Sequence, residues 1–239
     1  MAFLLTIIAG FSTMIGSCII FLKFKNIDNI INLSLSFAVG VMISVSIFDL
    51  IPESYNLFIG ETIPIVKLLI SINIGIIISM LLNKLINIED NLYRVGVISM
   101  VAIIIHNIPE GIVTYISTTH DIRLGISLTI AIALHNIPEG ISIALPIYCS
   151  TQSKKRALLY TLLSSVTEIV GALLAKLVLI NRISDLSMAA ILGCVSGIML
   201  YISIYELLPQ TKKYNNFKKT IISILIGGAI MILSIILIK

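Results

Sequence analysis

Long blocks of apolar residues, separated by short polar segments, run through the whole chain. Residues 1–22, 30–48 and 221–238 contain no charged side chain. A helix that crosses a bilayer needs about 20 mainly apolar residues, and blocks without an amphipathic stripe indicate lipid as the main solvent. The pattern therefore predicts an all-α integral membrane protein. Charge clusters and Pro, Gly and Asn signals divide it into eight transmembrane helices, at residues 2–22, 30–51, 64–86, 93–118, 122–148, 157–180, 186–208 and 219–238.

The first apolar block has two interpretations. Its length and hydrophobicity would also suit a secretory signal peptide. However, no basic residue precedes it and no convincing small-residue cleavage site follows it, as a signal peptide requires. We therefore expect a retained transmembrane helix. Because the predicted connections are short throughout, we expect one polytopic membrane domain over residues 1–239.

Composition supports this class and excludes a soluble domain. The mean hydropathy is +1.09, 58% of the residues are hydrophobic and only 12% are charged, whereas soluble domains carry about a quarter charged residues. The net charge of +4 is small and calls for no nucleic-acid partner. Cys18, Cys149 and Cys194 lie far apart without a CxxC spacing, so we interpret them as packing residues.

The basic residues predict the orientation of the chain. Lys and Arg concentrate in alternate connections, at residues 23–25, 84–94, 154–156 and 212–219. Short cytoplasmic loops carry an excess of Lys and Arg. We therefore assign these connections to the cytoplasm and predict that both termini are extracytoplasmic.

Two internal repeats are present. The sequence His-Asn-Ile-Pro-Glu-Gly-Ile occurs at residues 106–112 and again at 135–141, in adjacent and hence antiparallel spans. A weaker repeat aligns residues 38–52 with 195–209, in the second and seventh spans. Equivalent sequences in opposed orientations imply a pseudo-two-fold axis in the membrane plane, as in alternating-access transporters. We predict a 3+2+3 inverted-repeat arrangement.

The duplicated motif places metal-ligating groups on one helical face. His106 and Glu110 are one turn apart, with Asn107 three residues before Glu110. His135, Asn136 and Glu139 repeat this arrangement. A charged group in mid-membrane costs roughly 2.5–3.5 kcal/mol, so a purely structural use, twice at the same spacing, is a poor alternative. Imidazole with carboxylate suits Zn²⁺, Fe²⁺ and similar ions.

The prolines and glycines of the motif shape its surroundings. Pro109 and Pro138 each lack a backbone N–H and should kink their helices, while Gly111 and Gly140 permit close helix approach. The two faces offer more ligands than one tetrahedral ion requires. Two adjacent metal sites that share Glu110 and Glu139 would use them all.

Several further residues are candidates with weaker signals. Glu168 is a third carboxylate within a span, although nearby Ser and Thr side chains offer it a structural role. Met42 offers a thioether ligand or simple packing. Asp49 and Glu53 at the outer end of one span, and Glu206 at the inner end of another, are candidates for the two mouths of a pathway, although carboxylates are common at interfaces. His120 is expected to be a solvated loop residue.

The paired motif resembles the signature of the ZIP (zinc-regulated, iron-regulated transporter-like) family, especially its bacterial ZupT branch. The resemblance covers essentially the whole chain and implies metal uptake into the cytoplasm through a binuclear centre. Its first site would use His106, Glu110, His135 and Glu139, with Met42 as a further candidate. Its second would use Asn107, Glu110, Asn136, Glu139 and Glu168. Residues 87–91 contain no His, unlike the long His-rich loop of many eukaryotic members, which leaves regulation through that loop in doubt.

The favoured hypothesis is an alternating-access carrier of divalent transition metals, without enzymatic activity or a prosthetic group. Zinc is the expected cargo, and the mixed ligand set also tolerates iron, manganese, cobalt and cadmium. The expected partners are the metal ion and the lipid bilayer of a bacterial cell membrane, with a homodimer left open.

Two alternatives belong to other classes. The first is an intramembrane metalloprotease in which His106 and Glu110 hold zinc and activate water. The sequence contains no HExxH, and a hydrolase needs no duplicated ligand set. The second is a metal-gated sensor or channel, which conductance well above carrier turnover would reveal.

Overall fold

The computed structural model describes residues 1–23, 25–179, 184–214 and 216–238. Helices within this part of the chain are long and apolar enough to form eight membrane spans. They confirm the predicted all-α membrane architecture. The spans are Ala2–Phe21, Ile27–Phe58, Pro64–Leu85, Asn91–His120, Ile122–Thr151, Lys154–Val178, Asp185–Lys212 and Phe217–Leu237.

Several spans consist of helical segments joined end to end. A 3-10 turn, η1 (Cys18–Phe21), extends the first helix, and the π-helical turn η3 (Ala175–Leu179) extends the sixth span. The α-helices are α1 (Ala2–Ser17), α2 (Ile27–Val45), α3 (Ile51–Phe58), α4 (Pro64–Leu85), α5 (Asn91–His120), α6 (Ile122–Thr151), α7 (Lys154–Leu174), α8 (Asp185–Tyr201), α9 (Leu208–Lys212) and α10 (Phe217–Ile238).

Two further π-helical turns occupy matching places in the weaker repeat. The turn η2 (Ser46–Leu50) joins α2 to α3, and η4 (Ile202–Leu207) joins α8 to α9. Each is followed at once by a helix with proline in its first turn, Pro52 or Pro209. The wider turn accommodates the ring and the missing N–H of the proline. The helix therefore continues to Phe58, so the predicted end of the second span at residue 51 was wrong.

The connection between α5 and α6 is shorter than predicted. We expected a loop over residues 119–121, but α5 runs to His120 and α6 begins at Ile122. Asp121 alone joins them, and its carboxylate accepts a hydrogen bond from the N–H of Arg123, which caps α6. His120 is exposed, as expected, but is helical. The two motif helices thus form a tight antiparallel hairpin.

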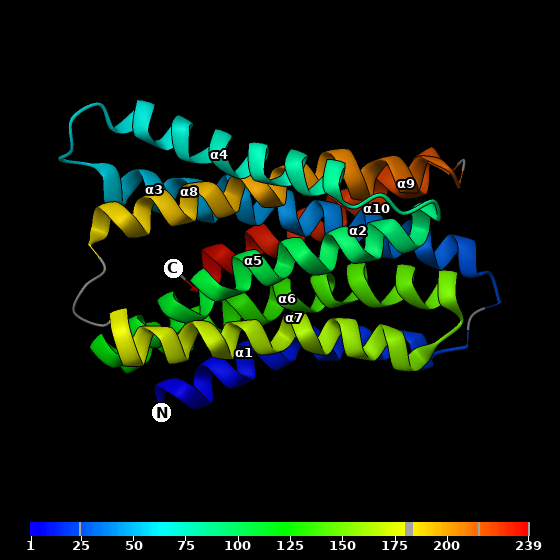
Figure 1. Cartoon of the computed structure of the whole chain (residues 1–239), viewed down its shortest axis with the longest axis horizontal. Helices are drawn as coiled ribbons and strands as arrows, with labels where there is room; N and C mark the ends of the chain where they lie inside the picture. The colour runs from blue at the N-terminus through cyan, green and yellow to red at the C-terminus, as the bar shows by residue number, and fades with distance from the viewer. Residues whose placement is uncertain (24, 180–183, 215, 239) are drawn as a thin grey trace.

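The helices pack as two groups. In the first, α1 packs on α6 and α7, and α5 packs on α6 and α7. In the second, α2 packs on α10, and α8 packs on α3 and α4. Figure 1 shows α1 along one edge of the molecule and α4 along the opposite edge, with both chain ends toward the same end of the helical array. The first group carries the duplicated motif.

Reciprocal glycine contacts hold the first group together. A Cβ added at Gly111 of α5 would lie 1.8 Å from the carbonyl oxygen of Glu168 in α7, and one at Gly171 of α7 would lie 2.1 Å from that of Ile108. On the other side of the hairpin, Gly140 of α6 and Gly16 of α1 approach the carbonyl oxygens of Thr13 and Ile137 in the same way. These backbones touch because glycine has no side chain.

Candidate metal centre

The duplicated motif brings its histidines and glutamates together crosswise between α5 and α6. His106 Nε2 lies 3.1 Å from Glu139 Oε2, and His135 Nε2 lies 3.2 Å from Glu110 Oε1. The i, i+4 spacing puts His and Glu on one face of each helix. The antiparallel hairpin then sets each His opposite the Glu of the other helix. Two imidazole–carboxylate pairs result.

The amide residues of the motif connect this hairpin to α1 and α7. Asn136 Nδ2 donates to Glu168 Oε2 at 2.9 Å and to the carbonyl oxygen of Ala9 at 3.0 Å. Asn107 Nδ2 donates to the carbonyl oxygen of Ser164 at 3.1 Å. The structure therefore brings Glu168, from α7, into the same centre. Both amides direct their NH₂ groups at protein atoms and leave their oxygens available.

Each predicted ligand is buried and keeps one polar atom without a hydrogen-bond partner among the described residues. Buried polar atoms in folded proteins are nearly always paired, and leaving one unpaired costs about 1–3 kcal/mol. Every one of these atoms carries a lone pair suited to a cation, except where an imidazole nitrogen holds the proton. They are His106 Nδ1, Asn107 Oδ1, Glu110 Oε2, His135 Nδ1, Asn136 Oδ1, Glu139 Oε1 and Glu168 Oε1.

The arrangement is one of pairs rather than a compact ligand cage. Among the described residues, no group of three or more His, Cys, Asp and Glu side chains is gathered closely enough to hold a metal ion. Each imidazole instead faces one carboxylate.

Pro109 and Pro138 lie inside their helices without ending them. Met42 is fully buried in an apolar cluster that includes Ile105, just before the first copy of the motif, and Ile141, the last residue of the second copy. The position of Met42 is thus compatible with both roles considered for it, apolar packing and a thioether ligand near the centre.

A cavity of about 510 Å³ leads from one end of the protein to the centre. Asp49, Glu53 and Asn56 line its outer part, and Glu110 and His135 line its inner part. Two carboxylates near the mouth create a negative potential that attracts cations. The structure thus places the candidate mouth residues of α2 and α3 on one path with the motif.

Glu206 lies toward the opposite end, in an ion pair that sequence analysis did not predict. Glu206 is 3% exposed, and its Oε2 accepts a hydrogen bond from Arg94 Nη2 at 3.3 Å. Arg94 Nη2 also donates to Asn83 Oδ1 at 2.6 Å. Arg94 belongs to α5, whereas Glu206 and Asn83 belong to the second helix group. The sequence signalled this cluster only by placing one of the polar residues Asn83, Arg94 and Glu206 in each of three apolar spans.

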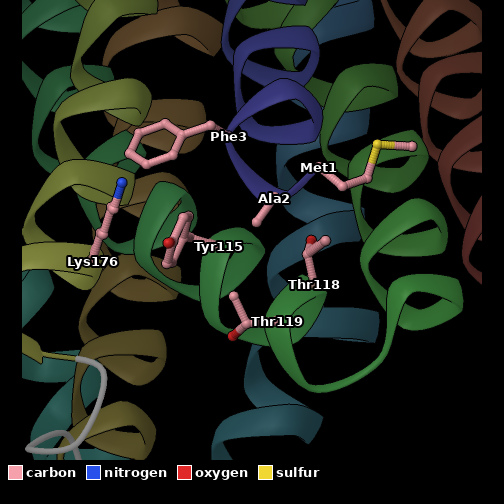
Figure 2. Close-up of a pocket in the computed structure, with 7 residues that line it drawn as sticks. All are labelled: Met1, Ala2, Phe3, Tyr115, Thr118, Thr119 and Lys176. Carbon is pink, nitrogen blue, oxygen red and sulfur yellow. The ribbon is translucent and has the colours of Figure 1, made fainter.

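A second cavity, of about 430 Å³, lies beside the start of α1 and shares no lining residue with the first. Figure 2 shows Phe3, Tyr115 and Lys176 around it. The Phe3 and Tyr115 rings meet edge to face, and Lys176 Nζ lies 5.3 Å from the centre of the Phe3 ring. None of the predicted ligands lines this cavity.

Comparison with known proteins identifies the family. The family described as "ZIP Zinc transporter" matches residues 87–235, which include both copies of the motif and Glu168. The chain belongs to the ZIP zinc transporter family.

Curated relatives extend the ZIP match over essentially the whole chain. The zinc transporter ZupT of Clostridium perfringens is 36% identical over 272 aligned positions, which cover 99% of this chain and 95% of the relative. The ZupT proteins of Oceanobacillus iheyensis and of Escherichia coli O127:H6 are 35% and 33% identical, each over 99% of this chain and 97% and 96% of the relative. The predicted resemblance to the bacterial ZupT branch is confirmed.

Membership in the ZIP family determines the class of the protein. Its eight apolar spans and bacterial relatives make it a multi-pass protein of a bacterial cell membrane. It is a transporter rather than an enzyme, so the metalloprotease alternative was wrong.

Proposed function

We propose that this ZIP protein carries Zn²⁺ across the cell membrane into the cytoplasm through the centre between α5 and α6. The observation that carries the proposal is the set of buried ligands with an unpaired polar atom each. Burying ionisable groups within a membrane is costly unless they are paired. A passing dication supplies the partner that these oxygen and nitrogen atoms lack. The names of the relatives, zinc transporter ZupT, support zinc as the cargo.

The centre is proposed to be binuclear. His106, Glu110, His135 and Glu139 would form the first site, with Met42 near it. Glu168 and the amide oxygens of Asn107 and Asn136 would complete the second, with Glu110 and Glu139 shared between them. The crosswise His–Glu distances support shared carboxylates, because each glutamate already faces a ligand of the other helix. The contact between Asn136 and Glu168 supports their joint membership of the second site.

We further propose alternating access, with both termini and the 510 Å³ cavity on the extracytoplasmic side. The matching π-helical turns η2 and η4 support the inverted repeat, as do the packing partners. In the expected repeat, the first, second and third spans correspond to the sixth, seventh and eighth, and the fourth corresponds to the fifth. The packing follows this correspondence: α5 packs on α7 as α6 packs on α1. Likewise α2 packs on α10 as α8 packs on α4. Backbone contacts at glycines make the first helix group stiff. The two groups are therefore the parts expected to move relative to each other, within one transport domain over residues 1–239.

Iron, manganese, cobalt and cadmium are included as further cargo ions. The donor set mixes imidazole, carboxylate and amide oxygen, which suits several first-row ions and selects weakly among them. Competition by each ion against zinc uptake in proteoliposomes measures this range. Ions that do not compete at a hundredfold excess would be removed from the proposal.

The experiment that tests zinc transport is uptake of radiolabelled zinc into proteoliposomes by the purified chain and by Glu110→Ala and Glu139→Ala. Both variants are expected to lose at least nine-tenths of the uptake rate, because each removes a carboxylate shared by the two sites. Glu61→Ala is the matched control, since Glu61 is an exposed carboxylate paired with Lys67 and lies outside the spans. Undiminished uptake by both centre variants would refute the proposal.

A further inference from the structure

The cavity at one end of α1, α5 and α7 carries a positive charge. Its volume is about 430 Å³, and Phe3 from α1, Tyr115 from α5 and Lys176 from η3 line it (Figure 2). No Asp or Glu is among the described residues that line it. Pockets for small ligands usually enclose about 300–1,000 Å³. The cavity therefore has room for a small anionic group.

Two hydrogen-bond donors of the cavity are unused within the described part of the chain. Lys176 Nζ lies 5.3 Å from the centre of the Phe3 ring and forms no ion pair with a described carboxylate. The hydroxyl of Tyr115 makes no hydrogen bond with a described residue. The hydroxyls of Thr118 and Thr119, in contrast, donate to backbone carbonyl oxygens. An ammonium and a phenol hydroxyl thus remain to bind an anion.

The cavity lies at the level of the lipid headgroups. Phe3 is the second residue of its span, Lys176 is the third from the end of its span, and Tyr115 is the sixth from the end. A helix rises 1.5 Å per residue, so all three lie within about 8 Å of the end of an apolar span. The headgroup region begins where apolar spans end. A lipid phosphate therefore meets the cavity without leaving the membrane surface.

Exposed apolar residues lead from the cavity toward the hydrocarbon. One row begins at Leu4, directly after Phe3, and the other at Leu177, directly after Lys176. Both rows continue at intervals of three and four residues, which keeps each on one face of its helix. The rows are Leu4, Ile8, Phe11 and Ile15 on the first span and Leu177, Leu173, Val170 and Val166 on the sixth. Acyl chains can lie along these rows, whereas a free phosphate has no use for them.

We propose that this cavity binds the headgroup of an anionic phospholipid, with Lys176 Nζ and the Tyr115 hydroxyl as donors to its phosphate. Basic pockets between membrane helices bind anionic headgroups in this way. A zwitterionic lipid would bring a second cation into a cavity whose described lining has no carboxylate. Lys176 also occupies the face of Phe3 that a quaternary ammonium would use. The site is separate from the metal centre, and its occupancy does not depend on the proposed zinc path.

The first test uses fluorescence, because the chain contains no Trp. Phe3→Trp introduces a single indole and keeps an aromatic ring beside Lys176. In phosphatidylcholine vesicles, phosphatidylglycerol with brominated acyl chains is expected to quench this Trp several-fold more than the same fraction of brominated phosphatidylcholine. Adding Lys176→Gln should abolish the preference, whereas Lys176→Arg, or Lys67→Gln at the Glu61 ion pair, should keep it. Equal quenching by the two lipids, or a preference that persists in Lys176→Gln, would overturn the proposal.

The second test separates a lipid in the cavity from a general enrichment and from a free anion. Phe48→Trp is the control position, because Phe48 is 49% exposed within a span and does not line the cavity. It should show no preference between the two brominated lipids, and an equal preference there would contradict a specific site. An excess of soluble glycerol phosphate should leave the quenching of Phe3→Trp unchanged. Loss of that quenching would show that the cavity takes a free anion and would exclude the lipid as its occupant.

Discussion

At the scale of single residues, the two sites of the proposed centre differ in which helices supply their ligands. The imidazole–carboxylate pairs come entirely from the α5–α6 hairpin. The proposed second site would also use Glu168 from α7, which is fully buried and hydrogen-bonded to Asn136. Removal of Glu168 therefore separates the two sites experimentally.

Glu168→Ala is expected to lower the zinc stoichiometry of the purified chain from two ions to one. The first site loses none of its ligands, so uptake should fall several-fold rather than vanish. Equilibrium dialysis with zinc measures the stoichiometry. A variant that still binds two ions with unchanged affinity would show that Glu168 is no ligand.

At the scale of helices, the start of α5 depends on Asp90. Its carboxylate accepts hydrogen bonds from the N–H groups of Leu92 and Tyr93 and from Ser150 Oγ of α6. The bond from Ser150, and after it the bond from Tyr93, lowers the pKa of Asp90 below its ordinary value of 3.8. Burial opposes this shift by less than either of these bonds, and the bond from Leu92 lowers the pKa further. Asp90 thus caps α5 and ties it to the end of α6.

Asp90→Ala is expected to cost about 0.5–2 kcal/mol of stability, the usual loss for an N-cap. Because the pKa of Asp90 is lower in the folded chain, its charge contributes stability above the unfolded pKa, and this contribution is lost as the pH falls below about 4. Asp90→Asn keeps a capping oxygen without the charge and should lack that acid-dependent loss. Thermal unfolding followed by circular dichroism at pH 3.5 and pH 7 measures the stability loss and its pH dependence. If the stability of Asp90→Asn fell between pH 7 and pH 3.5 as much as that of the unaltered chain, the role of the Asp90 charge would be contradicted.

Backbone contact at Gly171 predicts a second effect on the helices. In Gly171→Ala the new methyl group would press on the carbonyl oxygen of Ile108 and push α7, with Glu168, away from α5. Overpacking of this kind costs about 1–3 kcal/mol, and zinc uptake should fall with it. Gly228→Ala is the control, because the nearest atom there is the Ser44 hydroxyl at 3.0 Å. Equal uptake and unfolding temperatures in the two variants would show that the close contact is unimportant.

The sequence predicted what depends on local pattern. Eight spans followed from hydrophobic length, and the meeting of the two motif faces followed from a repeated spacing on two adjacent antiparallel helices. Which His faces which Glu was not predicted and is known only from the structure. The end of the second span was missed because a π-helical turn before Pro52 lets the helix continue past the proline. Whether such a turn forms depends on tertiary packing. The partner of Glu206 was missed because Arg94 is 112 residues away in the chain, and nothing in one sequence reports such a pairing.

At the scale of the whole molecule, the open cavity and the Arg94 cluster lie toward opposite ends. The cavity reaches Glu110 from the mouth at Asp49, while Arg94 joins α5 to Glu206 and Asn83 of the other helix group. Gln210 Nε2 adds a hydrogen bond to the carbonyl oxygen of Asn91 beside it. These contacts join the two helix groups at the end opposite the mouth, and in the proposed alternating access they would stabilise the conformation that is open at the mouth.

Arg94→Gln is expected to shift the protein toward the conformation that is open to the cytoplasm. The reason is that the variant leaves Glu206 without its cation and weakens the link between the helix groups. Ser127→Cys, in the cavity wall, should then react several-fold more slowly with an impermeant thiol reagent added from the mouth side. Lys67→Gln, whose ion pair lies within one loop and helix start, is the control. An unchanged labelling rate for Arg94→Gln would exclude a closing role for this cluster.

The link at Asp121 has a consequence for how an ion is released. One residue joins α5 to α6, and close glycine contacts tie each of them to a flanking helix, so we expect the hairpin to move as one unit. In the proposed transport cycle the ligands from α5 and those from α6 would therefore stay together. We therefore expect the ion to be released when new surroundings, such as cytoplasmic water, compete for it. Lengthening the link at Asp121 should weaken the binding of the ion.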